Sequence, residues 1–314
     1  MSVASDVCVS LGVLTIGELE DWGNSKQEVR DLMQEKSFQE YISEICASVG
    51  TYYQEKRTQI SGIQEEEGKQ IIEGKIRQDI ILSLAEENAI ASFTGKSWND
   101  IATITLENRK WLRDKMGETV KRIIGLVDGR ISLAKVDRKN GENLNIGISD
   151  CWLVAPKIRK IEIGIYPIEK LRQWAESKEE FVKAVRDCEF KTAIRDRRNG
   201  LGKVCEDNSI PIYFFEDLET VDSLEQKITE RTVQKLAEAQ AIASITGESW
   251  KSVANRTILD KKWLDEQINC SCDFWLERIK DKIKERRRAH LPDYDCELED
   301  GEVTDDSDTN YLNL

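Results

Sequence analysis

The chain has 314 residues and a formal net charge of -13 at pH 7, and 39% of its residues are hydrophobic and 33% charged. This length leaves room for two domains, and the high charged fraction is typical of helical bundles with solvated outer faces. No apolar run approaches the roughly 20 residues of a membrane-spanning helix, and the first residues lack the pattern of a signal peptide. We therefore expect a protein of the cytoplasm or nucleus that is neither secreted nor inserted in a membrane.

A long internal repeat organises the sequence. The segment LAEENAIASFTGKSW at Leu84 returns as LAEAQAIASITGESW at Leu236, and matched positions stay 152 residues apart without a gap. Ungapped self-similarity over this length indicates a tandem duplication. The predicted divisions are a first repeat unit (1–130), a β-hairpin and connector (131–157), a second repeat unit (158–290) and an acidic tail (291–314).

Each unit is predicted to open with a short β-like run, VSLGVL or IEIGIY, in which apolar residues surround one glycine that favours a bend. A short amphipathic helix, a polar break and a second helix follow. In the first unit, apolar residues then keep helical spacing from Phe38 to Tyr53. Residues 59–75 diverge most from their counterpart, in which IPIYFF at 210–215 suggests an extended segment.

A long helix is expected over residues 72–93 and again over residues 224–245. Both copies run into a Thr-Gly pair, and glycine there favours the left-handed conformation that ends many helices. The serine two residues after each glycine is placed to cap the next short helix. A last helix is expected to begin near Thr105 in the first unit and near Thr257 in the second.

The connector and the tail lie outside the repeat. ISLAKVDRKNGENLNIGI predicts a β-hairpin centred on Asn140-Gly141. Residues 291–314 are acidic and have little to bury, so we expect them to be disordered. The predicted fold is mainly α: two helical-bundle units with short β elements.

Six of the eight tryptophans form three matched pairs. Their helical setting among Ile and Leu favours a role as anchors of each core. A stacking platform for bases, or a peptide groove, is the alternative interpretation. The six predicted core anchors are Trp22, Trp98, Trp111, Trp174, Trp250 and Trp263.

Basic residues gather in and just before the second unit, where they either meet phosphates or belong to solvated helix faces with acidic partners. The acidic tail directly after Arg286 to Arg288 suggests a third possibility, a tethered competitor that screens a basic patch. The candidate polyanion-binding residues are Lys157, Arg159, Lys160, Arg195, Arg197, Arg198, Lys203, Arg286, Arg287 and Arg288.

The sequence predicts no catalytic, cofactor-binding or metal-binding site. The one histidine, His290, adjoins the tail, so it is a poor general base. Cys270-x-Cys272 lacks the second ligand pair that zinc needs, and free thiols are expected. The matched carboxylates Glu86 and Glu238 are expected to be solvated positions on a long helix.

No motif resembles that of a known family. We expect a non-enzymatic interaction or scaffold protein that has two related helical lobes, a flexible acidic tail and protein partners. The alternative is a protein that binds RNA or DNA through its basic second lobe, with the tail as an autoinhibitor. A carboxylate- or metal-dependent enzyme is a third class. The sequence leaves homo-oligomerisation open.

Overall fold

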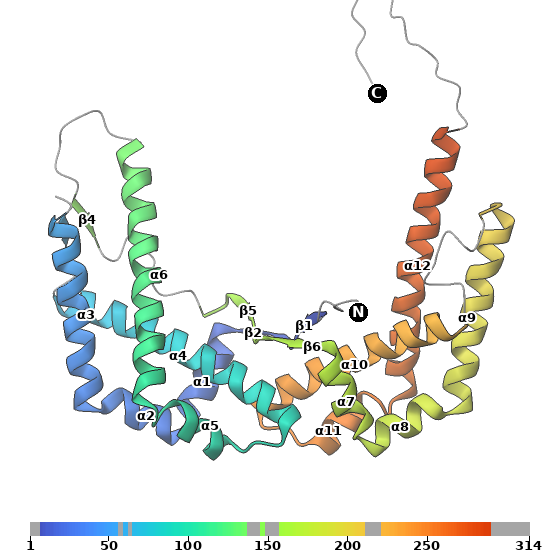
Figure 1. Ribbon diagram of the computed structural model, residues 1–314, viewed down its shortest axis with the longest axis horizontal. Helices are drawn as coiled ribbons and strands as arrows, with labels where there is room; N and C mark the ends of the chain where they lie inside the picture. The colour runs from blue at the N-terminus through green and yellow to red at the C-terminus, as the bar shows by residue number, and fades with distance from the viewer. Residues whose placement is uncertain are drawn as a thin grey trace, which may run out of the picture.

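The computed structural model describes residues 7–55, 59–61, 65–136, 145–147, 157–210 and 221–289. Helices make up most of these residues, which confirms the predicted mainly α fold, and three short two-stranded sheets complete it. Two upright pairs of long helices rise from a base of crossing helices, so that the molecule has the outline of a U (Figure 1).

The same order of elements occurs twice. The first half comprises β1 (Cys8–Ser10), β2 (Val13–Thr15), α1 (Ile16–Ser25), α2 (Gln27–Gln34), α3 (Lys36–Glu55), α4 (Glu66–Thr94), α5 (Trp98–Thr105) and α6 (Arg109–Val136). The second comprises β5 (Lys160–Glu162), β6 (Ile165–Pro167), α7 (Ile168–Glu176), α8 (Glu179–Arg186), α9 (Cys188–Asp207), α10 (Val221–Thr246), α11 (Trp250–Arg256) and α12 (Lys261–Ala289). Helices α3 and α6 form one upright arm, and α9 and α12 form the other (Figure 1). Duplication remains our interpretation of the sequence repeat.

The predicted signals at the end of the long helix are confirmed in both halves. Gly95 and Gly247 have φ angles of 74° and 77°, in the left-handed region that glycine adopts without strain. Ser97 forms a capping box with Asp100, and the Ser249 side chain accepts a hydrogen bond from a backbone N–H three residues later. Local sequence therefore determines where α4 and α10 end and where α5 and α11 begin.

The last helix of each half begins four residues later than predicted, at Arg109 and at Lys261. The prediction overlooked two capping residues. Asn108 Oδ1 accepts hydrogen bonds of 3.1 and 3.2 Å from the backbone N–H groups two and three residues later. Asp260 Oδ1 accepts one of 2.9 Å in the same way. Because these side chains satisfy donors that no helix carbonyl reaches, they define the start of α6 and α12.

The predicted hairpin is wrong over residues 131–136, which continue α6. Ile123, Val127 and Ile131, spaced by four residues, are all buried, so the apolar face of this helix extends into the supposed strand. Strand β4 (Asn145–Gly147) instead pairs in parallel with β3 (Gln59–Ser61).

Several other predictions fall outside the described ranges. These are the turn at Asn140-Gly141, the extended segment at 211–215, His290 and the acidic tail 291–314. They stay predictions from the sequence alone.

The two halves are joined through their strands. Strand β1 pairs with β6, and β2 with β5, both antiparallel. The register is symmetric. Val9 lies opposite Tyr166, and their counterparts in the other half, Ile161 and Leu14, also lie opposite each other. The bend between β1 and β2 is at Gly12, with φ of 132°, and the matched glycine has 130°. A local two-fold axis therefore relates the halves.

The main hydrophobic core spans both repeat units, and a smaller cluster lies in the second unit alone. One cluster of buried side chains draws on helices α1 to α8, α10 and α11, and a second on α9, α12 and the start of α10. Helices α4 and α10 meet at the centre, where Asn88 Nδ2 donates to both O and Oγ of Ser244 at 3.1 Å. The shared core fixes the position of one half relative to the other. No helix in the described ranges has both the length and the apolar character to cross a membrane.

Candidate docking pockets

A pocket of about 300 Å³ lies where α8, the start of α9 and the start of α12 meet. Its floor is apolar, since Phe190 and Ile258 are buried and Leu264 is half-buried. Its rim carries Glu189 and Lys261, both exposed. An apolar floor under a charged rim suits a side chain with an apolar body and a polar end.

Two adjoining pockets of about 300 and 510 Å³ occupy the matched corner of the first half. Phe38 and Leu112 lie in the floor of one and Leu106 in that of the other, and all three are buried. They are the counterparts of the three floor residues of the second half. Glu35 and Arg109 line both pockets, so the division between them falls at this pair.

A surface ion pair lies in each corner. Nη1 and Nη2 of Arg109 both donate hydrogen bonds to the Glu35 carboxylate, Nη1 at 3.0 Å. These hydrogen bonds hold the pKa of Glu35 below its usual value. Lys261, the counterpart of Arg109, pairs with Glu189, which raises the pKa of Lys261. Exposed pairs add little stability. Their charged groups are therefore available for exchange with those of a partner.

A pair of tryptophans supports each corner. Trp22 and Trp98 meet edge to face with ring centroids 5.5 Å apart, and the matched Trp174 and Trp250 do so at 5.7 Å. In each half one lysine ammonium lies over both rings, between 5.0 and 5.7 Å from the centroids. Such aromatic and cation–π contacts restrict the orientation of short helices.

The second tryptophan of each pair also holds an acidic residue of the pocket wall. Trp98 Nε1 donates to Glu28 Oε2 at 3.0 Å, and Trp250 Nε1 donates to Glu180 Oε2 at 3.3 Å. Glu28 and Glu180 line the pockets of their halves. The hydrogen bond from Trp98 holds the pKa of Glu28 below its usual value. The pairs therefore connect the core to the pocket walls.

All six repeated tryptophans belong to the main core. Trp22 and Trp174 are each 6% exposed, whereas the other four, Trp98, Trp111, Trp250 and Trp263, are partly buried and pack against the same cluster. This placement favours the interpretation as core anchors over a stacking platform.

The pocket rims differ between the halves. Glu107 of the first half corresponds to Leu259 of the second, whose side chain is 53% exposed. Asp31 likewise corresponds to Lys183. The first rim is therefore more acidic and the second more apolar, over floors of the same kind.

The ten predicted polyanion-binding residues do not form one surface. Lys157, Arg159 and Lys160 lie at or beside β5 in the centre of the molecule, where Lys157 pairs with Glu20 at 3.4 Å. The other seven lie on α9 and α12 in one upright arm (Figure 1): Arg195, Arg197, Arg198, Lys203, Arg286, Arg287 and Arg288.

Much of the positive charge on α12 is paired within the helix. Lys280, Lys282 and Lys284 each contact a carboxylate three residues away, at 2.6, 2.6 and 3.2 Å. These contacts favour the interpretation as a solvated helix face. Arg286 donates to the backbone carbonyl of Ser209, which joins the ends of α12 and α9.

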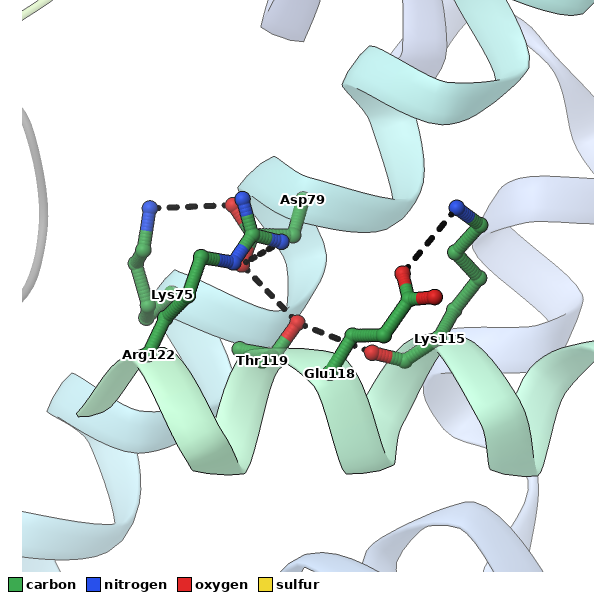
Figure 2. A network of polar contacts seen from close by, with 6 residues as sticks. All are labelled: Lys75, Asp79, Lys115, Glu118, Thr119 and Arg122. Carbon is green, nitrogen blue, oxygen red and sulfur yellow. Dashed lines mark hydrogen bonds and ion pairs between the residues drawn. The ribbon is translucent and has the colours of Figure 1, made fainter. Parts of the chain in front are cut away.

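Sequence reasoning missed a buried carboxylate. Asp79 on α4 is 5% exposed, and its oxygens receive Lys75 Nζ at 2.9 Å, Thr119 Oγ1 at 2.8 Å and Arg122 Nη2 at 2.8 Å. Figure 2 shows the network between α4 and α6. The sequence did contain a clue to this burial, because Asp79 lies between Ile76 and Ile80 on the apolar face of its helix. With two cations and a hydroxyl around it, Asp79 acts as a structural connection between base and arm.

The matched carboxylates Glu86 and Glu238 are partly buried and are not the fully solvated positions that the sequence predicted. Glu86 packs close to Gly164, and burial raises the pKa of Glu86. Glu238 pairs with Lys235 at 2.7 Å. Within the ranges that the structure describes, no three His, Cys, Asp or Glu side chains gather as metal ligands. The cysteines in these ranges are free thiols.

The matched corners are thus concave features that the two halves have in common. Each combines an apolar floor, a surface ion pair and a carboxylate held by a tryptophan. Comparison of the chain with protein-family models, with curated proteins and with solved structures found no match.

Proposed function

We propose that this protein is a non-enzymatic interaction scaffold that presents two related docking pockets to protein partners. The recurrence of the pocket at matched corners of both halves carries the proposal. Volumes of 300 to 510 Å³ admit a few side chains of a partner and not a folded domain. Partners therefore dock through a short segment.

The shared core supports a bivalent role. Because the strands cross between the halves and α4 contacts α10, the two corners keep a constant spacing. A partner with two docking segments at a suitable separation gains affinity through effective concentration. The different rims, with Glu107 in one half and Leu259 in the other, suggest that the two corners prefer different segments.

A pair of matched surface substitutions tests the proposal. Leu259→Asp places a charge in the second pocket, whereas Ile104→Asp changes a residue of nearly equal exposure, 52% against 53%, on α5. Proteins crosslinked in cells to the unchanged chain would be compared with those crosslinked to each variant, by quantitative mass spectrometry. We expect Leu259→Asp alone to lose a defined set of partners. Equal sets for all three proteins would contradict docking at this corner.

The upright arm of α9 and α12 carries the second candidate function, nucleic-acid binding. Arg287 and Arg288 at the end of α12 are exposed, and no ion pair engages them within the described chain. Fluorescence anisotropy with RNA and DNA at two salt concentrations would compare the full chain with a chain ending at His290. Salt-sensitive binding that strengthens without the tail would support this function and tail autoinhibition. No binding by either chain at low salt would exclude it.

A further inference from the structure

The position that Asp79 holds in the first half is occupied in the second by a residue of opposite charge, Arg231. In the first half the anion on α4 is matched by Lys75 and by Arg122 of α6. In the second half the counterpart of Arg122 is Phe274. The reversal of charge on α10 therefore has no compensating carboxylate at the matched position on α12.

Among the described residues, Arg231 has no hydrogen-bonding or ionic partner. Its Nε is closed off from solvent, has no hydrogen-bond acceptor, and Arg231 forms no ion pair with the described residues. The adjacent acid, Glu230, is already engaged by Arg172 at 2.6 Å and by Gln226 at 3.0 Å. A shielded, unpaired guanidinium N–H is unusual in a folded protein, because buried donors are normally satisfied.

Further positive charge lies on the same face of α10. Lys227 and Lys235 stand four residues before and after Arg231, a spacing that places all three side chains along one side of the helix. Lys235 is paired with Glu238 at 2.7 Å. Lys227 is exposed and, within the described ranges, has neither an ion pair nor a hydrogen bond. Two adjacent cations on this face therefore lack a counter-charge.

We propose that Arg231 and Lys227 form a binding site for a phosphate group. The two terminal Nη groups of the guanidinium, which unlike Nε are not closed off from solvent, present paired N–H donors that match phosphate oxygens, and the lysine ammonium adds a point charge one helical turn away. A phosphate that carries up to two negative charges balances two cations, whereas a single carboxylate balances one. The ligand supplies the anionic oxygens that Asp79 supplies in the first half.

The test follows the side-chain Nε–H of Arg231 by two-dimensional ¹H–¹⁵N NMR of the full chain. Inorganic phosphate would be titrated at constant ionic strength, with chloride as the replaced anion. We expect the Arg231 signal to move with a saturable, millimolar dependence, while that of Arg172, which is already paired with carboxylates, stays in place. An Arg231 signal that does not move with phosphate would overturn the proposal.

Two variants and a second anion complete the test. Lys227→Gln alters an exposed side chain and is expected to weaken phosphate binding about fivefold, as for loss of one surface charge contact. In Arg231→Gln, the phosphate-dependent shifts of the neighbouring backbone signals are expected to disappear. Acetate is expected to move the Arg231 signal much less than phosphate. An equal response to acetate, or unchanged affinity in Lys227→Gln, would refute a phosphate site built from these two cations.

Discussion

Replacing Asp79 by asparagine removes a charge and leaves the shape of the side chain nearly unchanged. The Asp79 side chain is 6% exposed, and its carboxylate oxygens accept hydrogen bonds from Lys75, Thr119 and Arg122 (Figure 2). Removing one partner of a fully buried ion pair costs about 3–5 kcal/mol. Arg122 is 53% exposed and regains water, whereas Lys75 is 16% exposed and remains shielded. We therefore expect Asp79→Asn to lower the free energy of unfolding by about 2–3 kcal/mol.

Urea unfolding followed by far-ultraviolet circular dichroism measures the effect, with the denaturant slope as a check that the same surface is exposed. Glu118→Gln is the control, because Glu118 pairs with Lys115 at 3.1 Å in the same view but is 58% exposed. This exposed pair is expected to contribute less than about 0.5 kcal/mol. If Asp79→Asn were no more destabilising than Glu118→Gln, the assignment of Asp79 as the connection between α4 and α6 would be wrong.

Three further predictions concern single sites. Burial raises the pKa of the Cys272 thiol to about 11, so alkylation of native Cys272 should be much slower than that of exposed Cys188, as measured by peptide mapping; equal rates would contradict its burial. Burial also raises the pKa of Glu86, so the folded chain holds the carboxyl proton more tightly than the unfolded chain does. The free energy of unfolding that this proton contributes is lost as pH rises through the folded pKa. Glu86→Gln should therefore raise the melting temperature at pH 7 but not near pH 4, and a gain independent of pH would refute this reasoning. Gly23→Ala should destabilise by about 1–3 kcal/mol because the added Cβ would lie 2.7 Å from a core side chain, whereas Gly117→Ala meets open space and should stabilise by up to about 1 kcal/mol; chemical denaturation checks both signs.

Much of the local structure could be predicted because its causes lie within a few residues of sequence. Ser97 and Gly95 cap helices through contacts with their own neighbours, and the apolar spacing from Phe38 to Tyr53 marks one buried face of α3. The hairpin was predicted wrongly because two local patterns compete there. Asn140-Gly141 suggested a turn, but the buried series that ends at Ile131 continued the preceding helix to residue 136.

The candidate site was less accessible to sequence reasoning. The pocket floors combine residues such as Phe190 and Ile258, which are far apart in the chain and individually resemble ordinary core positions. The predicted basic cluster shows the reverse case. Lys157 and Arg286 belong to the same predicted set of basic residues, but the fold places one beside the central strands and the other in an upright arm.

The sequence by itself determined the repeated order of helices and the glycine and serine positions that end and begin them, because helix periodicity and capping depend on neighbouring residues. Only the tertiary structure decided that β1 pairs with β6 of the other half, that the main core spans both halves, and that the Asp79 carboxylate is satisfied while Nε of Arg231 is not. These outcomes depend on which surfaces meet across about 150 residues of chain. A carboxylate or a guanidinium has the same local signature whether or not a distant helix supplies its counter-charge.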